Sequence, residues 1–263
     1  RQRRFLSEVG LRRCFCSHSE VVSTEYNTTK KRIFLIGMIR DDAFFVSTLN
    51  IDSKIMTHKA GFVNIVGNPN VGKSTLMNQL VGERISIATF KAQTTRHRIM
   101  GIVNTDDMQI VFSDTPGVLK PNYKMQEMML AFSESALADA DILLYVTDVV
   151  ENAEKNLDFL EKVRKMTIPV LLLINKIDES NQKELGNIVT QWHKLLPNAE
   201  ILPISAKNNF GTDMLMKRIQ ELLPESPAYF DKEQLTDKPA KFFVSEIIRE
   251  KILRYYDKEI PYS

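Results

Sequence analysis

The sequence predicts an α/β fold in which a mainly parallel sheet is flanked by helices. Apolar runs alternate with helix-like segments between residues 61 and 223, which is the order that builds parallel sheets. Most of these runs are apolar throughout, as expected for strands buried on both faces. A glycine-rich loop, 67–75, separates the first run from the first helix-like segment. Together these observations predict a phosphate-loop domain whose ligand binds beyond the carboxyl ends of the strands.

The hydrophobic pattern places the individual elements. Strands are expected at 61–66, 99–103, 109–113, 142–147, 170–174 and 200–204. Helices are expected at 73–81, 123–138, 152–165, 182–196 and 213–223, with a further helix near 244–256. A chain of 263 residues with 43% hydrophobic residues can bury a substantial core around such a sheet.

Charge and cysteine usage exclude some classes of protein. Residues 1–55 hold ten Lys and Arg against six Asp and Glu, so the net charge of +2 leaves −2 for the remainder. A nearly neutral body carries no electrostatic footprint for nucleic acid. The only cysteines, Cys14 and Cys16, lack the second pair of ligands that a zinc site needs. No apolar run reaches the roughly 20 residues of a transmembrane segment, so none is expected.

Residues 1–55 are expected to be a disordered or non-native leader. Met56 precedes the first convincing strand closely and is the expected start of the working protein. An organelle transit segment is an alternative, because the stretch contains many Arg and Ser residues, but Glu8, Glu20 and Glu25 argue against it. A short basic arm for nucleic acid is a further alternative.

The glycine-rich loop has the residues of a phosphate-binding loop. Its glycines let successive backbone N–H groups point at phosphate oxygens, and the following helix adds partial positive charge. Lys73 is expected to reach the β- and γ-phosphates, and the Ser74 hydroxyl to ligate Mg²⁺. The alternative is an ordinary glycine-rich turn. The expected ligand-binding set here is Gly67, Asn68, Pro69, Asn70, Val71, Gly72, Lys73, Ser74 and Thr75.

A second acidic element follows the strand at 109–113. Asp114 is expected to hold Mg²⁺ through water, and Gly117 allows a backbone N–H to approach the γ-phosphate. The turn adds Asp114, Thr115, Pro116, Gly117 and Val118 to the expected binding residues.

Two further loops are expected to read the base. An ionised Asp178 can accept from N1–H and the 2-amino group of guanine, whereas adenine offers an acceptor at N1 and no 2-amino group. Asn175 would tie down the loop, and the stem of Lys176 would cover the ring. In the second loop, the Ala206 N–H could meet guanine O6. A polar loop that caps the next helix is the alternative, and an ATPase would leave Asp178 idle. These loops contribute Asn175, Lys176, Ile177, Asp178, Ser205, Ala206 and Lys207.

The polar segment 83–98 is the candidate nucleotide-sensing switch. A threonine there can complete the Mg²⁺ shell only while the γ-phosphate is present, and we choose Thr95 over Thr94. The expected metal residues are therefore Ser74, Thr95 and Asp114. Arg96, His97 and Arg98 are interpreted as solvated loop charges rather than phosphate contacts.

These motifs together resemble the Era family of ribosome-associated GTPases. The resemblance rests on the loops above, on Gln93-Thr-Thr-Arg-His-Arg98, and on a block from Asp237 that is similar to the opening of the Era KH domain. It implies a G domain at 56–224, a linker at 225–238 and the truncated start of an RNA-binding KH domain at 239–263. The KH Gly-x-x-Gly loop does not follow Phe242, so RNA binding by this chain is expected to be weakened.

The family resemblance also implies partners and a location. It implies GTP and GDP as ligands, with small-subunit (16S) ribosomal RNA and the 30S subunit as partners of the full-length protein. A cytoplasmic location is implied, with peripheral association at the inner face of the cell membrane. A mitochondrial location is the alternative if residues 1–55 are a transit segment.

The expected activity is GTP hydrolysis, in which water attacks the γ-phosphate in line. Lys73, Thr95 and Asn70 are the candidate catalytic residues. Val118 occupies the place where many GTPases have a water-orienting Gln, and by similarity to GTPases with the same loop Asn70 would hold K⁺ beside the phosphates. A turn residue with an unusual backbone angle is the equal alternative for Asn70. A nucleotide-gated ribosome adaptor with incidental hydrolysis, and a tRNA-modification GTPase, remain as alternative functions.

Overall fold

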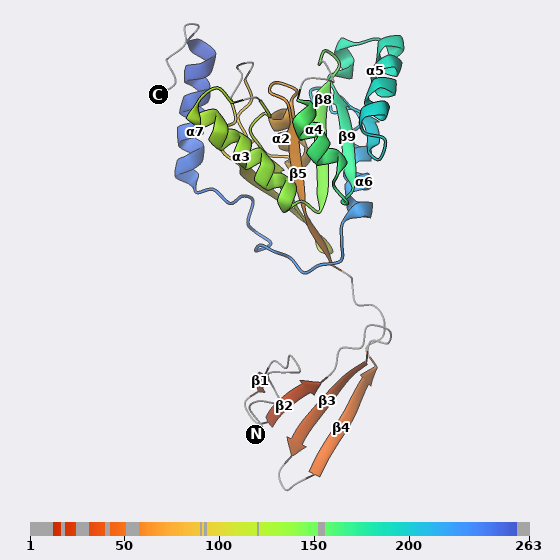
Figure 1. Cartoon of the computed structure of the whole chain (residues 1–263). Coiled ribbons are helices and arrows are strands. Elements are labelled where there is room, and N and C mark those ends of the chain that lie inside the picture. The colour runs from red at the N-terminus through yellow and green to blue at the C-terminus, as the bar shows by residue number, and fades with distance from the viewer. Residues whose placement is uncertain are drawn as a thin grey trace. The chain divides into compact units, whose positions relative to one another are not determined.

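The computed structural model describes residues 58–89, 91, 94–119, 121–151 and 156–256, and the backbone of strands within residues 13–50. The chain divides into two compact units, Arg1–Met56 and Thr57–Ser263 (Figure 1). Met56, Gln93 and residues 257–263, which entered the sequence predictions, lie outside the described residues.

The first unit contains a four-stranded antiparallel sheet in the order β1-β2-β3-β4. Its strands are β1 (Arg13–Cys16), β2 (Ser19–Thr24), β3 (Arg32–Ile39) and β4 (Ala43–Asn50). Strand pairing occurs here where disorder or weak packing was expected, and the interpretation of this segment as a leader stays a prediction.

The second unit is built on a six-stranded sheet in the order β10-β9-β8-β5-β7-β6. All neighbours are parallel except β6 and β7, which confirms the predicted mainly parallel sheet. The strands are β5 (Lys59–Gly67), β6 (Ile99–Asn104), β7 (Met108–Asp114), β8 (Ile142–Asp148), β9 (Val170–Asn175) and β10 (Glu200–Pro203). Strand β5 is central, so the glycine-rich loop that follows it leaves the middle of the sheet.

Helices cover both faces of this sheet (Figure 1). They are α2 (Lys73–Val81), α3 (Lys124–Ala138), α4 (Leu157–Arg164), α5 (Gln182–Leu195), α6 (Thr212–Leu222) and α7 (Ala240–Tyr255), with a 3₁₀ turn η1 (Ile177–Glu179). Side chains of α2 and α6 pack with Val63 and Ile65 of β5 in one core cluster. Side chains of α3, α4 and α5 pack with Val66, Leu143 and Tyr145 in the other. Successive side chains along a strand point to opposite faces, so the strands contribute to two apolar layers, as a sheet covered on both faces requires.

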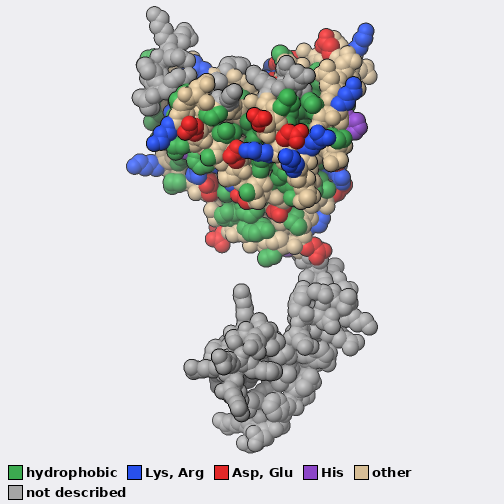
Figure 2. All heavy atoms as spheres, viewed as in Figure 1, with side chains coloured by type: hydrophobic (Ala, Val, Ile, Leu, Met, Phe, Trp, Pro, Cys, Tyr) green, Lys and Arg blue, Asp and Glu red, His purple; other side chains and the backbone are tan. Residues whose placement is uncertain are grey.

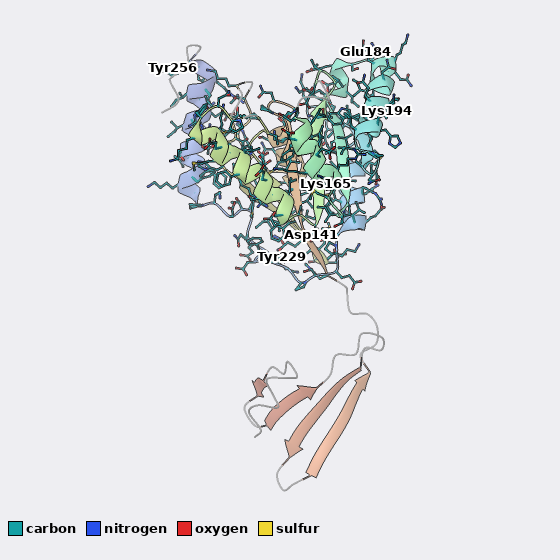
Figure 3. The ribbon with its side chains drawn as sticks, viewed as in Figure 1. Asp141, Lys165, Glu184, Lys194, Tyr229 and Tyr256 are labelled. Carbon is teal, nitrogen blue, oxygen red and sulfur yellow. The ribbon has the colours of Figure 1, made fainter. Side chains whose placement is uncertain are left out.

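The segment between α6 and α7 runs past one end of the sheet and then along its edge (Figure 1). The Ile102 N–H on β6 donates to the Leu235 carbonyl at 2.8 Å. The buried Gln109 side chain donates to the Phe230 carbonyl at 2.8 Å and accepts from the Tyr229 N–H at 2.7 Å. In Figure 3, Tyr229 and Asp141 mark one end of the sheet, and Glu184 and Tyr256 lie toward the other. The segment predicted as a linker is thus hydrogen-bonded to the domain.

Helix α7 buries its two acidic residues and packs Phe242 and Phe243 on the core, but it exposes several other apolar residues. Glu246 and Glu250 are its buried residues, whereas Val244, Ile247 and Ile248 are each more than half exposed. Elsewhere, one face of this unit carries acidic and basic side chains interspersed with hydrophobic ones (Figure 2).

None of the described helices is long and apolar enough to cross a membrane.

Candidate functional site

The glycine-rich loop lies between β5 and α2 and requires its glycines. Gly67 has φ of 145° and Gly72 has φ of 96°, values that side-chain-bearing residues rarely adopt. A Cβ at Gly67 would lie 2.1 Å from the Val146 carbonyl oxygen, and one at Gly72 would lie 2.3 Å from Nδ2 of Asn175. The backbone is therefore packed closely against the carboxyl ends of β8 and β9, which leaves no room for a side chain at either glycine.

Lys73 opens α2 inside this loop. Its side chain is buried, with the residue only 6% exposed, and Nζ donates to the Asn68 carbonyl at 2.7 Å. Burial lowers the pKa of Lys73 to about 8, although the charges of Asp114 and Glu151 act in the opposite direction. Because burial disfavours the charged form of Lys73, binding of an anion such as a phosphate would stabilise the ammonium group.

The predicted metal residues come together at the end of β7. Asp114 is fully buried, and its Oδ2 accepts from Ser74 Oγ at 2.6 Å and from Thr95 Oγ1 at 3.4 Å. The Ser74 and Thr95 hydroxyl oxygens lie 2.9 Å apart. Burial raises the pKa of Asp114, while hydrogen bonds from Ser74, Ser86 and Thr95 and the charge of Lys73 lower it.

These residues fit Mg²⁺. The Asp114 Oδ1 atom is buried and has no hydrogen-bond partner, and the hydroxyls beside the carboxylate supply further hard oxygen ligands. No cluster of three His, Cys, Asp or Glu side chains occurs among the described residues. A single carboxylate is sufficient for Mg²⁺ when substrate phosphates and water complete its shell.

The turn after Asp114 lies directly on the glycine-rich loop. The Val118 N–H donates to the Gly67 carbonyl at 3.0 Å, and Thr115 Oγ1 donates to the Ile65 carbonyl at 2.8 Å. A Cβ at Gly117 would come within 2.7 Å of the Pro69 Cα. Val118 itself is only 3% exposed and can neither donate nor accept through its side chain.

The two loops that were predicted to read the base meet at Asn175. This residue is 3% exposed, and its Nδ2 donates to the Val71 carbonyl at 2.8 Å while its Oδ1 accepts from the Ala206 N–H at 2.9 Å. One side chain therefore joins the glycine-rich loop to the loop at 205–207. The Ala206 N–H, which was expected to meet guanine O6, donates to Asn175 instead. The structure brings all four predicted loops to the carboxyl ends of strands β5, β7, β9 and β10, at one edge of the sheet.

Asp178 is exposed in η1. Ser205 Oγ donates to its Oδ1 at 2.6 Å, and this hydrogen bond is the main reason that the pKa of Asp178 is lowered. Lys176 has a left-handed backbone, with φ of 61°, and its Nζ pairs with Asp148 Oδ2 at 2.6 Å. The expected stacking of the Lys176 stem on a ring stays a prediction, as does the base contact of Asp178.

The candidate switch has one buried threonine aimed at the metal residues. Thr94 Oγ1 instead donates to the Lys91 carbonyl at 2.6 Å and lies 2.6 Å from Thr89 Oγ1, so the geometry favours Thr95 as predicted. Helix α7 contacts the same segment, because Arg249 donates to the Thr94 carbonyl at 2.5 Å.

The interpretation of Arg98 as a solvated loop charge is wrong. Its guanidinium donates to Ser113 Oγ at 2.6 Å, to Asn64 Oδ1 at 3.1 Å and to Asp139 Oδ2 at 2.6 Å. Asn64 and Ser113 are fully buried, and Arg98 supplies a donor to the Oδ1 of the first and the Oγ of the second. Arg98 thereby anchors the end of the switch to β5 and β7.

Sequence reasoning missed two polar contacts beside the loops. Asn156 donates to Asn68 Oδ1 at 2.5 Å and to the Val118 carbonyl at 3.1 Å, and so bridges the glycine-rich loop and the turn. Ser86 donates to Asp114 Oδ2 at 2.6 Å. Asn156 lies outside every predicted segment. Ser86 lies within the candidate switch at 83–98, where its only signal is a small polar residue between two isoleucines.

This fold and site define a phosphate-loop nucleotide-binding protein of the GTPase class. Residues 62–176 match the family model described as 50S ribosome-binding GTPase. GTPase Era from Lactobacillus delbrueckii subsp. bulgaricus is 46% identical over 207 residues, covering 78% of this chain and 68% of that protein. GTPase Era from Alkaliphilus metalliredigens is 42% identical over 209 residues, covering 79% and 71%.

Solved structures agree with the curated relatives. Era in complex with MgGDPNP and nucleotides 1506–1542 of 16S ribosomal RNA has a TM-score of 0.73 at 36% identity, over 78% of this chain and 70% of that one. An Aquifex aeolicus Era variant bound to GDP and AlF₄⁻ has a TM-score of 0.73 at 37% identity, over 77% and 70%. The chain belongs to the Era family of GTPases.

Proposed function

We propose that this chain is a GTP-hydrolysing switch that acts in assembly of the small ribosomal subunit through 16S ribosomal RNA. The similarity to an Era protein solved with a GTP analogue and a 16S fragment supports the partner. The observation that carries the nucleotide is the Asn175 side chain, which holds the phosphate loop and the base loop together through Val71 and Ala206. One nucleotide can therefore contact both loops at once.

The proposed contacts follow from the geometry. Backbone N–H groups of 67–75 and Lys73 hold the phosphates, and the turn at 114–118 closes beside the γ-phosphate. Ser74, Thr95 and Asp114 hold Mg²⁺, which when bound supplies charge neutralisation to the phosphates. Asp178 faces the guanine, with Ser205 keeping it ionised, and Asn175 holds the base loops against the phosphate loop.

Hydrolysis is an in-line attack of water on the γ-phosphorus. A bond forms between the water oxygen and phosphorus, the bond to the β–γ bridging oxygen breaks, and GDP and phosphate leave. The buried Lys73 ammonium neutralises charge that develops on the phosphate oxygens. Since Val118 cannot orient the water, intrinsic hydrolysis is slow.

We propose that a K⁺ ion held by Asn70 beside the phosphates supplies stabilising charge, since Val118 contributes no polar group. The positive φ of 65° at Asn70 equally favours the alternative, a turn residue. We expect K⁺ to accelerate hydrolysis over Na⁺ at matched ionic strength by roughly 10-fold or more, since it would take the place of an arginine finger, which contributes roughly 10³–10⁵ in rate. Asn70→Ala should remove the gain, and equal rates in the two salts would contradict the role.

A nucleotide-gated adaptor with incidental hydrolysis is the second candidate, and the buried apolar Val118 favours it. Single-turnover hydrolysis with and without small ribosomal subunits separates the two. A switch should hydrolyse GTP at least roughly 10-fold faster with subunits. Binding to subunits in GTP but not GDP, with an unchanged hydrolysis rate, would favour the adaptor.

The location of the protein and the limits of its domains are proposed less specifically. We place the activity in the cytoplasm, where ribosomal subunits assemble. Peripheral membrane association, the mitochondrial alternative and the expected domain limits at 56–224, 225–238 and 239–263 rest on sequence alone.

A further inference from the structure

Ser86 is a buried hydroxyl that no motif predicts and that contacts the metal-site carboxylate. It lies in the loop after α2, is 1% exposed, and donates to Asp114 Oδ2 at 2.6 Å. Ser74 and Thr95 donate to the same oxygen, but both are proposed Mg²⁺ ligands. Ser86 is thus the one of these three donors that has no other proposed partner in the reaction.

The position of Ser86 is set by the helix that follows the phosphate loop. Asn78 of α2 accepts from the Ser86 N–H at 2.9 Å and from the Ile85 N–H at 3.0 Å, and its Nδ2 donates to the Ser86 carbonyl at 2.7 Å. Ile85 and Ile87 are each 5% exposed, so both neighbours are anchored in the core. Asn78 lies one turn beyond Ser74, on the same side of α2.

This arrangement fixes the rotation of the Asp114 carboxyl group. The Ser74, Ser86 and Thr95 hydroxyls all donate to Oδ2, and Oδ1 is buried without a hydrogen-bond partner. A hydrogen bond that holds one carboxylate oxygen presents the other in a defined direction, which is how outer contacts orient metal ligands. If Ser86 were lost, the carboxyl group could rotate about its terminal torsion, which is intrinsically broad.

We propose that Ser86, held by Asn78, is a positioning residue that aims Asp114 Oδ1 at Mg²⁺. The proposal rests on the Mg²⁺ site of the proposed function and deepens it.

The test measures Mg²⁺ affinity without hydrolysis. GDP carrying a ribose-linked fluorophore is bound to the whole chain, and its dissociation rate is followed as free Mg²⁺ is titrated. Ser86→Ala should raise the Mg²⁺ concentration that half-maximally slows release by roughly 10- to 100-fold, the range for outer-contact variants. The dissociation rate in EDTA should stay at the unmodified value, because Ser86 does not contact the nucleotide. Ser86→Thr should restore part of the affinity.

Ser133→Ala is the matched control. Ser133 is also fully buried and donates to the carbonyl of Pro116 at 2.8 Å, so it supports the same turn without contacting Asp114. In Ser133→Ala, the Mg²⁺ concentration that half-maximally slows GDP release should stay within about threefold of the value for the unmodified chain, the size of change expected from a substitution without a specific role. If Ser86→Ala does not fold, Ser86→Cys keeps the volume with a weaker donor and should give an intermediate shift.

The outcomes are distinguishable. An unchanged Mg²⁺ midpoint in Ser86→Ala, or an equal shift in Ser133→Ala, overturns the positioning role. An unmodified chain whose GDP release ignores Mg²⁺ overturns the proposed metal site itself. A shift confined to Ser86→Ala, with partial rescue by Thr, supports the proposal.

Discussion

The two ends of the proposed nucleotide site differ in their electrostatics. At the phosphate end, Lys73 is 6% exposed and Asp114 is 0% exposed. Burial lowers the pKa of Lys73 and raises the pKa of Asp114, so in both cases it favours the neutral form. At the base end, Asp178 is exposed and a hydrogen bond from Ser205 lowers its pKa. The phosphate end therefore carries desolvated charge that a ligand can relieve, while the base end is ionised in advance.

This difference separates affinity from selectivity. Desolvated charges at the phosphate end gain most when a triphosphate and Mg²⁺ arrive, so variants there should change stability and its pH dependence. The preset carboxylate at the base end should decide which base is accepted, with little effect on folding. Asn175 is the residue through which the two ends meet.

The largest expected effect is at Asp178. Asp178→Asn presents a donor where guanine also donates, so GTP affinity should fall by roughly 10³-fold or more while xanthosine triphosphate binds better. Thermal unfolding should be unchanged, because the side chain is exposed. Competition binding measures the effect, and Glu179→Gln in the same turn is the control. A GTP affinity like that of the unmodified chain would remove Asp178 from the site.

Next in size is the bridge between the ends. Asn175→Ala leaves the buried Val71 carbonyl and Ala206 N–H without their partner and should lower the free energy of unfolding by about 2–4 kcal/mol. Urea unfolding of the nucleotide-free chain measures it. A loss below about 0.5 kcal/mol, the size of an ordinary surface change, would show that the loops hold each other by other means.

A third prediction concerns pH. Because burial lowers the pKa of Lys73 to about 8, the folded nucleotide-free chain binds fewer protons than the unfolded chain above this pH. Lys73 should therefore make the free energy of unfolding rise by about 2 kcal/mol between roughly pH 8 and 10. Lys73→Met should remove this rise, and Lys217→Met, at an exposed position on α6, should keep it. A rise that persists in Lys73→Met would contradict the assignment.

The smallest expected effect is at Ser205. Ser205→Ala removes the hydrogen bond that lowers the pKa of Asp178, but water can replace it at an exposed carboxylate. GTP affinity at neutral pH should fall by only about fivefold. On acidification, GTP binding should be lost at a higher pH than in the unmodified chain, because Asp178 protonates earlier. If GTP binding were lost at the same pH in Ser205→Ala and in the unmodified chain, Ser205 would not be what keeps Asp178 ionised.

Local patterns were sufficient to predict the strands and the loops that follow them. Gly67–Thr75 and Asp114–Gly117 carry their chemistry in consecutive residues, and the strands of unit two are read from apolar runs. Sheet order, with β5 between β8 and β7, depends on long-range pairing that no local pattern encodes.

Contacts between distant segments explain what was missed. Arg98 sits beside Arg96 and His97 in a polar stretch, but its partners Asn64, Ser113 and Asp139 come from other elements. The segment at 225–238 has a composition typical of a linker, and its attachment depends on the buried Gln109 and on the free edge of β6. Such hydrogen bonds become visible only once the sheet is assembled.

Calorimetric titration of the unmodified chain with GTP and with ATP, each with Mg²⁺, tests the central claim most directly. If a buried phosphate cradle and an ionised Asp178 grip one nucleotide, GTP should bind at least roughly 10³-fold more tightly than ATP. Equal affinity for the two nucleotides would show that the base end does not read guanine, and would contradict this account.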